Sequence, residues 1–433
     1  MAAELEQKRL VALDVFRGMT IAGMVLVNNP GSWSAIYSPL KHAEWHGITP
    51  TDYIFPFFLF IVGVAIPIAL GRRVADGLTK GVYLKILSRA ATIFALGLFL
   101  TAFPLLDFSG GGVPLGAMLF IMFALATSVY LWLTEKTKYA ISLLGITAAL
   151  AATFYTLGFQ VVFISFETLR IPGVLQRIAV CYLIVSILFL HTNWKQLAIV
   201  GGILLLFYWL AMSIVPVPGC AVTTIDDKAC NLSAYLDRLI LGENHLWRSA
   251  KVYDPEGILS TLPALVTTIS GALTGLWLKK DKSDLEKVGG LFFFGVVLCA
   301  IGWCWNFFFP FNKPLWTSSY VVYTSGLALC FLGVCYWLID IKGYRAWTKP
   351  FVIFGVNALA LYVGSGLLAR MLGVVKVAGA DGKEVYLQKW IFDQVFTPLA
   401  APVNASLMYA VSYILLWLFL MWLLYRKRIY IKV

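Results

Sequence analysis

Residues 41–63, KHAEWHGITPTDYIFPFFLFIVG, join a short polar stretch to a continuous apolar run of membrane length. His42 and His46 lie in the polar stretch and are two of four histidines in the chain. An imidazole at a membrane surface can transfer a proton or act as a nucleophile, although a surface histidine without a role is the simpler interpretation. The spacing also suits a metal ion, but no third ligand accompanies the pair, so the sequence predicts no metal site.

Two further polar residues lie at the ends of the first two apolar runs. Asp52 begins the second run, where it can cap a helix or orient an imidazole. Asn28 ends the first run shortly before a proline, which is typical of a helix end. An amide at this position could also donate a hydrogen bond to an oxyanion. We expect Asn28 and His42 on the same face of the membrane, where they could line one pocket and act as catalytic residues.

An unpaired charge is costly inside an apolar run, where Asp14, Arg17 and Arg177 fall. Asp14 and Arg17 are three positions apart and can pair on one helical face. They either form a structural ion pair or contribute to a site for a phosphate or pantetheine group. Arg177 lies one turn into another apolar run and needs a partner such as Asp14 or a bound phosphate. The three residues are therefore candidates for cofactor binding.

A second group of residues could contact a substrate. Asp254 and Glu256 precede an apolar run, where a helix dipole favours them and where they could hold a cationic amine or sugar hydroxyls. Trp316 could stack on a sugar face or belong to the aromatic belt of the membrane interface, which is the commoner case. Together with Asp52, these residues form the predicted substrate-binding set.

The composition indicates a polytopic membrane protein. The chain has 433 residues, of which 60% are hydrophobic and 13% are charged. Its apolar runs are continuous and about 20 residues long, which indicates helices and not the alternating strands of an outer-membrane barrel. The net charge of +12 comes largely from lysines and arginines in short loops, as cytoplasmic retention requires. The basic charge therefore does not indicate a nucleic-acid partner; the predicted partner is the lipid bilayer.

The pattern predicts an all-α fold with about twelve transmembrane helices in a single domain, residues 1–433. Basic residues gather in alternate loops, which places both termini in the cytoplasm. The predicted spans are 10–29, 49–71, 84–104, 113–133, 138–158, 171–191, 195–215, 258–278, 288–309, 318–339, 349–372 and 403–425.

Two long loops then lie on the extracytoplasmic face, at about 216–257 and 373–402. Cys220 and Cys230 share the first loop, so a disulfide is plausible if that loop faces an oxidising compartment. The other five cysteines fall in apolar runs and are expected to be inert packing residues.

Several segments resemble the heparan-α-glucosaminide N-acetyltransferase family and its bacterial relatives. The matching segments are LDVFRGMTIAGMVLVNNPG (13–31), HAEWHGITPTDYIFPFFLFIVGV (42–64), LRIPGVLQRIAVCY (169–182), YDPEGILSTLP (253–263) and PLWTSSYVVYTSG (314–326). The resemblance implies acetyl transfer from cytosolic acetyl-CoA to the amine of a terminal glucosamine across the membrane. It places the essential histidine at His42 and the active-site asparagine at Asn28, and it implies a homodimer. Helices between about 106 and 169 look like an insertion into the family pattern.

The sequence thus predicts an acetyl-CoA-dependent acyltransferase of the bacterial inner membrane that acts on an amino sugar or glycan. His42 would be the general base or would carry the acetyl group transiently. The alternatives are an amino-sugar permease and an O-acyltransferase of a glycan. The helix count suits a permease equally well, but a permease has no evident use for the His42 and Asn28 pair.

Overall fold

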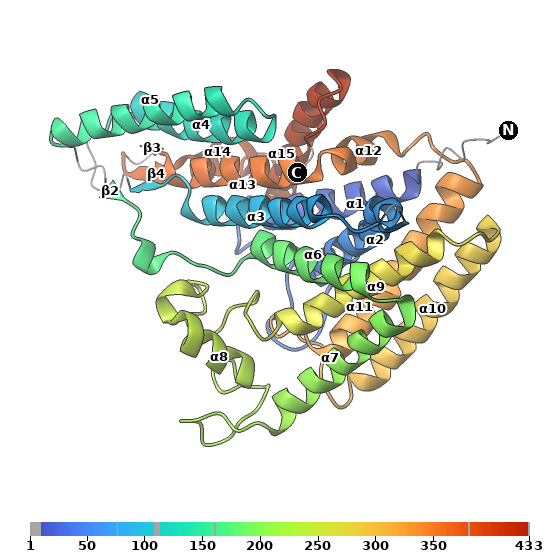
Figure 1. Ribbon diagram of the computed structural model, residues 1–433. Coiled ribbons are helices and arrows are strands. Elements are labelled where there is room, and N and C mark those ends of the chain that lie inside the picture. Colours follow the sequence, from blue (N-terminus) through green and yellow to red (C-terminus); the bar gives the residue numbers. More distant parts are fainter. Residues whose placement is uncertain (1–9, 76, 108–112, 160–161, 380–381, 432–433) are drawn as a thin grey trace. The chain divides into compact units, whose positions relative to one another are not determined.

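The computed structural model describes residues 10–75, 77–107, 113–159, 162–379 and 382–431, which are mainly helical (Figure 1). The long helices follow the apolar runs closely, because each run is long enough to satisfy its backbone internally within a bilayer. The helices are α1 (Val11–Asn28), α2 (Ile54–Ala75), α3 (Lys80–Ala102), α4 (Leu115–Leu133), α5 (Thr137–Thr156), α6 (Val174–His191), α7 (Trp194–Ile214), α9 (Thr261–Leu278), α10 (Asp284–Trp305), α11 (Ser318–Cys335) and α15 (Pro402–Arg426).

Eleven helices of the described residues are long and apolar enough to cross a membrane, and a broken pair brings the number to twelve. This confirms the predicted all-α membrane fold. The broken pair corrects one detail, because the predicted span 349–372 is two helices, α12 (Lys349–Val356) and α13 (Ala358–Val374). The break falls at Asn357, whose φ of −124° and ψ of 33° are not helical.

The chain folds into two compact units. The first unit comprises the described residues of Met1–Met24 together with Pro39–Phe94 and Pro172–Ala358. The second comprises Val25–Ser38, the described residues of Ala95–Ile171, and those of Leu359–Val433. His42 and Asp52 therefore belong to the first unit, whereas Asn28 belongs to the second.

In the first unit, α2 and α9 pack closely through glycines, as small residues allow in membrane helices. A Cβ atom on Gly63 of α2 would lie 2.0 Å from the carbonyl oxygen of Thr268 on α9. A Cβ atom on Gly271 of α9 would lie 2.0 Å from the carbonyl oxygen of Phe60 on α2. This packing fixes the two helices relative to each other, and the polar segments that carry Asp52 and Glu256 lead directly into them.

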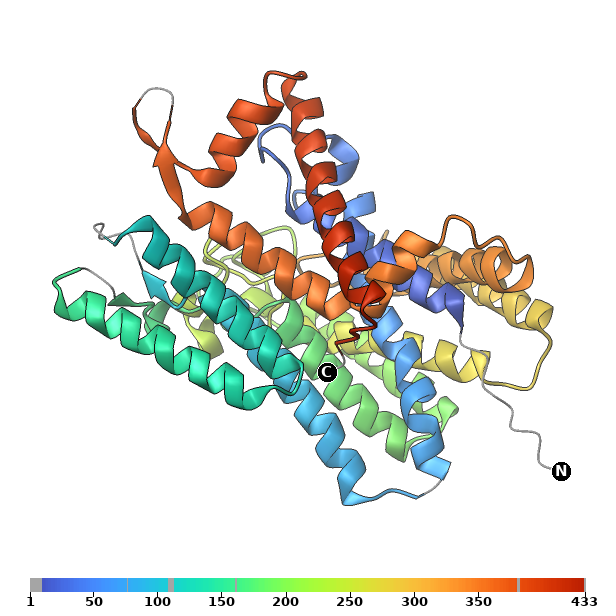
Figure 2. The ribbon, with the colours of Figure 1, turned by 90° about the horizontal axis from the view of Figure 1, so that it is seen from above.

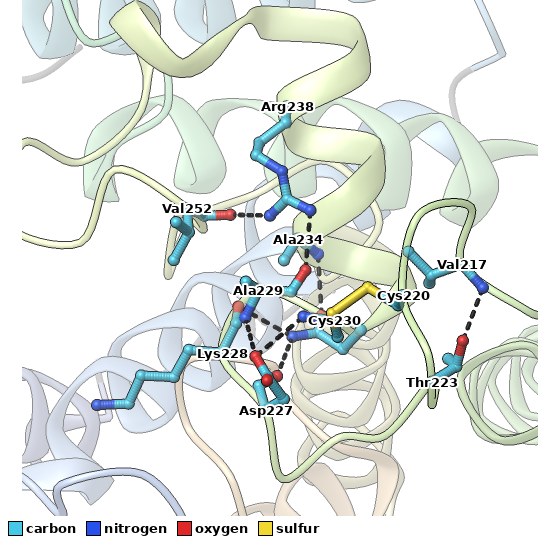
Figure 3. Close-up of a disulfide and its surroundings, with 11 residues drawn as sticks. Val217, Cys220, Thr223, Asp227, Lys228, Ala229, Cys230, Ala234, Arg238 and Val252 are labelled. Carbon is cyan, nitrogen blue, oxygen red and sulfur yellow. Dashed lines mark hydrogen bonds between the residues drawn. A yellow bond between two sulfur atoms is a disulfide. The ribbon is translucent and has the colours of Figure 1, made fainter.

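The predicted loop 216–257 contains a helix that the sequence pattern did not indicate, α8 (Leu232–Leu241). Asn231 caps it by accepting a hydrogen bond from the Ala234 amide at 2.9 Å. Cys220 and Cys230 form a disulfide just before this helix (Figure 3). Asp227 accepts hydrogen bonds from the amides of Ala229 and Cys230, so the loop is folded tightly around the bridge.

In the second unit, α4 and α5 form an antiparallel pair that lies side by side in both views (Figure 2). Two short antiparallel ladders join β1 (Leu106–Asp107) with β2 (Val162–Phe163), and β3 (Lys376–Ala378) with β4 (Glu384–Tyr386). The second ladder and α14 (Leu387–Ile391) occupy the predicted loop 373–402, except for residues 380 and 381, which lie outside the described residues.

Candidate active site

Asp52 folds the polar segment before α2 into a compact loop. It lies in a short 3-10 turn, Pro50–Tyr53, and its side chain is only 1% exposed. Its Oδ2 atom accepts hydrogen bonds from the Ala43 amide at 3.1 Å and from the Thr49 amide and hydroxyl, each at 3.0 Å. A buried carboxylate that accepts several hydrogen bonds is favoured in its ionised form. The loop is therefore organised around one negative charge.

The other carboxylate oxygen of Asp52 orients His42. Asp52 Oδ1 lies 2.7 Å from His42 Nδ1, and the imidazole is 47% exposed. Because an ionised carboxylate only accepts hydrogen bonds, Nδ1 must carry the proton and donate it. The neutral tautomer then leaves Nε2 without a proton. Asp52 thus orients the imidazole as the sequence allowed. The N-cap of the turn is Thr49, and Asp52 completes a capping box from the third position, whereas its burial leaves no surface for a substrate.

Lys313 lies against the imidazole, a contact that the sequence interpretation missed. Its Nζ atom lies 2.9 Å from His42 Nδ1, 3.3 Å from His42 Nε2 and 3.5 Å from Asp52 Oδ1, and its side chain is 18% exposed. Burial lowers the pKa of the Lys313 ammonium, while the nearby carboxylates of Asp52 and Glu256 raise it. The available signal was that Lys313 is the single charged residue between the predicted spans 288–309 and 318–339.

A rigid turn presents Lys313 to the imidazole. Asn312 closes this turn by accepting a hydrogen bond from the Leu315 amide at 2.8 Å with its side chain, and from the Thr317 amide at 3.1 Å with its carbonyl. The Thr317 hydroxyl accepts in return from the Asn312 amide at 3.0 Å. Within the turn, Trp316 has a φ of 53°, a left-handed conformation that is strained for a tryptophan. The surrounding contacts therefore stabilise a backbone conformation that is unfavourable by itself.

The disulfide loop holds the segment that follows His42. The Trp45 indole donates a hydrogen bond to the Ile225 carbonyl at 2.8 Å, and His46 Nε2 lies 2.9 Å from Asp226 Oδ1. Both loop residues lie between the bridged Cys220 and Cys230. His46 therefore has a structural partner of its own in the disulfide loop.

Arg177 is buried in a polar cluster behind this site. Its side chain is 3% exposed, and its NH2 atom donates hydrogen bonds to the Gly257 carbonyl at 3.1 Å and to the Ser260 hydroxyl. Its guanidinium lies over the Trp316 ring, 5.1 Å from the centroid. The expected partner Asp14 is thus wrong for the described residues, because a carbonyl, a hydroxyl and an aromatic face take that place.

Trp316 is packed in the core. It is 1% exposed, and its indole donates a hydrogen bond to the Thr267 hydroxyl at 3.1 Å. A sugar face needs an exposed ring, and so does an interfacial belt. The burial of Trp316 accordingly favours a packing role over both interpretations that the sequence suggested.

Asp254 and Glu256 lie on the loop that leads into α9. Asp254 is buried, and its Oδ1 accepts a hydrogen bond from the Glu256 amide at 2.9 Å, which fixes the turn. Glu256 is half-buried and acts electrostatically on Lys313. Glu256 therefore acts on Lys313 by its charge, and Asp254 fixes the backbone turn that carries Glu256.

Asp237 on α8 is a buried carboxyl beside this loop. Burial raises its pKa to about 6, and the hydrogen bond from the Ile258 amide and the charge of Arg177 oppose this shift only in part. Its Oδ2 atom has no hydrogen-bond partner among the described residues. Asp237 is therefore a buried carboxyl whose pKa is raised and whose hydrogen-bond donor is the Ile258 amide of this loop.

The predicted pair on α1 is present. Arg17 NH1 lies 3.3 Å from Asp14 Oδ1 and donates a second hydrogen bond to the Gly355 carbonyl at 3.3 Å. The Arg17 side chain remains 25% exposed, so it can also reach an external anion. The pair satisfies the structural interpretation and leaves the cofactor-binding interpretation open to test.

Asn28 is the last residue of α1, and it is exposed. Its neighbour Asn29 is buried and donates a hydrogen bond back to the Val25 carbonyl at 2.8 Å. This end of α1 lies in the second unit, so the common pocket of Asn28 and His42 stays a prediction.

The geometry of the first unit can do one kind of chemistry well. A half-exposed imidazole is held by a buried carboxylate through one nitrogen and presents the other nitrogen as a proton acceptor or nucleophile. The residues that contact it come from two places in the sequence, the segment 42–52 and the turn at Lys313.

Comparison with known proteins relates the chain to one family and to two curated proteins. Residues 9–214 match a family described as a domain of unknown function (DUF5009). The chain is 26% identical to heparan-alpha-glucosaminide N-acetyltransferase of Mus musculus over 414 residues, which cover 83% of this chain and 54% of the relative. It is also 26% identical to the Homo sapiens protein of that name over 410 residues, which cover 82% of this chain and 52% of the relative. The chain is a distant relative of these proteins and spans about half of their length.

Proposed function

We propose that this protein is a transmembrane N-acetyltransferase that moves an acetyl group from acetyl-CoA to the amine of a glucosamine-type sugar. The observation that carries the proposal is the contact of 2.7 Å between His42 and the buried Asp52, which leaves His42 Nε2 free to accept a proton. The names of the distant relatives support the acetyl group and the sugar class.

The chemistry follows from the tautomer. The amine nitrogen of the acceptor attacks the thioester carbonyl, a C–N bond forms, and the C–S bond breaks as the thiolate leaves. His42 Nε2 takes the proton that the attacking amine loses, and Asp52 stabilises the imidazolium that results. Asn28 donates a hydrogen bond to the oxyanion of the tetrahedral intermediate in this proposal.

The donor would supply the acetyl group as an activated thioester, and it also carries phosphate groups. Arg17 is the better candidate for its phosphates, because a quarter of its side chain is exposed, whereas Arg177 is enclosed by its partners. Arg177 instead holds the loop at Gly257 in place, next to Glu256.

The acceptor is a sugar with a cationic amine in this proposal. The half-buried Glu256 carboxylate, which acts electrostatically on Lys313, can attract such an amine. The ammonium first loses one proton to water, and His42 then takes the second proton as the C–N bond forms. Asp254 contributes by fixing the Glu256 turn.

The sugar is handled on the extracytoplasmic side of a bacterial inner membrane, with both termini in the cytoplasm. Two observations support this orientation: the basic loops alternate with the loops of the His42 face, and the disulfide beside the site suits an oxidising compartment. A homodimer would be consistent with the family resemblance.

The proposal is tested with purified protein in detergent, radiolabelled acetyl-CoA and glucosamine. We expect wild-type protein to form N-acetylglucosamine. His42→Ala should lose at least about a hundredfold in rate while remaining folded, because a positioned base contributes 10²–10⁴ in rate. His191→Ala, which removes a histidine bonded to Tyr83 at 3.1 Å, is the matched control and should keep its activity.

Transport is the competing outcome. Uptake of glucosamine into vesicles without acetyl-CoA, together with no transfer to any amino sugar, would replace the acetyltransferase with a permease. Transfer to a sugar hydroxyl but not to its amine would identify an O-acyltransferase instead.

A further inference from the structure

Lys313 has no role in the proton transfer described above, yet it makes the closest cationic contact to the imidazole. Its Nζ atom lies within 3.3 Å of both ring nitrogens of His42. An atom near both nitrogens cannot lie along the in-plane lone pair of either. Because Nδ1 directs its proton to Asp52 Oδ1, the ammonium acts on the ring by its charge and leaves Nε2 available.

Asp52 alone would create a difficulty for a base. A buried carboxylate at 2.7 Å favours the protonated imidazolium, which cannot accept a further proton. A lysine ammonium at about 3 Å has the opposite effect, because two like charges so close repel each other. Even at the dielectric constant of water, this repulsion corresponds to about one pH unit in the titration of the imidazole.

We propose that Lys313 is a positioning residue that keeps His42 unprotonated beside an ionised Asp52, so that Nε2 stays a competent base. The inference rests on the proposed function only for what Nε2 does. Asp52 acts on this site from the same segment as His42, and Lys313 and, through Lys313, Glu256 act on it from other segments. Lys41 and Glu44 are the other charged residues of the His42 segment.

The local backbone structure fixes Lys313 in its contact with His42. The turn of Asn312 and Thr317 accepts a left-handed conformation at Trp316 and fixes the backbone that carries Lys313. The Leu315 carbonyl in this turn also accepts a hydrogen bond from the buried Tyr208 hydroxyl at 2.5 Å. A flexible surface lysine would need none of these restraints.

The test is a histidine titration followed by NMR in detergent-solubilised protein with isotopically labelled histidine. The chain has four histidines, and the His42 signal is assigned as the one missing from His42→Ala. Lys313→Gln removes the charge at similar length, and we expect the midpoint of the His42 titration to rise by about one pH unit or more. Lys313→Arg retains the charge and should restore the wild-type midpoint to within about 0.3 units.

Internal controls separate an electrostatic effect from a structural one. The signal of His191, which contacts Tyr83, should not move in either variant. An unchanged His42 midpoint in folded Lys313→Gln, or equal shifts in the Gln and Arg variants, would overturn the proposal. If Lys313→Gln does not fold, Lys313→Met keeps the apolar stem of the side chain and takes its place in the same titration.

The titration does not depend on any enzymatic activity, so it judges Lys313 even if the proposed function fails. Where transfer is measurable, the acid limb of the pH–rate profile should move upwards with the NMR midpoint in Lys313→Gln and return in Lys313→Arg. If the acid limb of the pH–rate profile stays in place while the NMR midpoint of His42 moves, Lys313 has no role in the reaction, and this part of the proposal is overturned.

Discussion

Asp52 uses its two carboxylate oxygens for two different tasks. Oδ1 orients His42, while Oδ2 holds the amides of Ala43 and Thr49 and so shapes the loop. One buried residue therefore fixes both the tautomer of the proposed base and the backbone that carries it. The consequence is that the orientation of His42 can be altered without removing His42.

Asp52→Asn tests this orienting role. An amide can donate a hydrogen bond to Nδ1, which reverses the tautomer and places the proton on Nε2. We predict that kcat for acetyl transfer falls by about 10²–10⁴ while KM changes far less. Thr49→Val is the matched control, since it removes the hydroxyl contacts to Oδ2 and to the Lys41 carbonyl but keeps the carboxylate, and it should stay within about tenfold of wild type. Equal kcat values for Asp52→Asn and wild type would contradict the role.

Asp237 makes stability depend on pH at a position away from the imidazole. Its folded-state pKa of about 6 lies above the ordinary value of 3.8, so the folded protein binds the proton more tightly. The free energy of unfolding should therefore fall as pH rises from about 4 through about 6. Asp237→Asn should abolish this fall and exceed wild type by about 1–3 kcal/mol at pH 7.5. Thermal unfolding at pH 5 and pH 7.5 checks it, and parallel pH dependence in both proteins would refute it.

At the scale of elements, the site depends on segments that are far apart in the sequence. The loop of residues 42–52 and the turn before α11 meet at one imidazole, and Glu256 in the loop before α9 acts on Lys313 by its charge. The close packing of α2 on α9 through Gly63 and Gly271 fixes two of these segments relative to each other. The disulfide loop adds a brace, because it accepts the Trp45 indole and contacts His46.

The brace yields a prediction about the disulfide. Cys220 and Cys230 are ten positions apart, so the loop-entropy relation gives a contribution of about 2–3 kcal/mol to the free energy of unfolding. The double variant Cys220→Ser and Cys230→Ser should lose this stability and also lose transfer activity, because Trp45 and His46 lose their fixed partners. Thermal unfolding and rate measurements check both effects.

A reductant offers the matching control for the brace. Wild-type protein treated with a reductant should behave as the double variant does, and the double variant should not respond to the reductant. Unchanged stability in both cases would show that the loop is held by its hydrogen bonds alone.

At the scale of the whole molecule, the sequence predicts the helices better than the site. Apolar runs of membrane length define the spans, since each must satisfy its backbone within itself, and eleven of the predicted spans are single helices. The break at Asn357 was missed, because one asparagine in an apolar run does not reveal a change of backbone direction. His42, Asp52 and Glu256 were identifiable by residue type and position.

The contacts among these residues could not be predicted in the same way. The approach of Lys313 to His42 and the burial of Trp316 depend on tertiary packing between segments about 270 residues apart, which no local pattern encodes. The partners of Arg177 could not be predicted for the same reason, because the Gly257 carbonyl that it contacts lies on a loop distant in the sequence.

The measurement that tests the central claim most directly is acetyl transfer across a sealed membrane. The protein is reconstituted in vesicles with glucosamine inside and radiolabelled acetyl-CoA outside, and the product is located after separation of the two compartments. For protein molecules whose termini face outwards, the account predicts N-acetylglucosamine inside the vesicles with wild type and none with His42→Ala. Product formed only outside, or formed equally by folded His42→Ala, would contradict it.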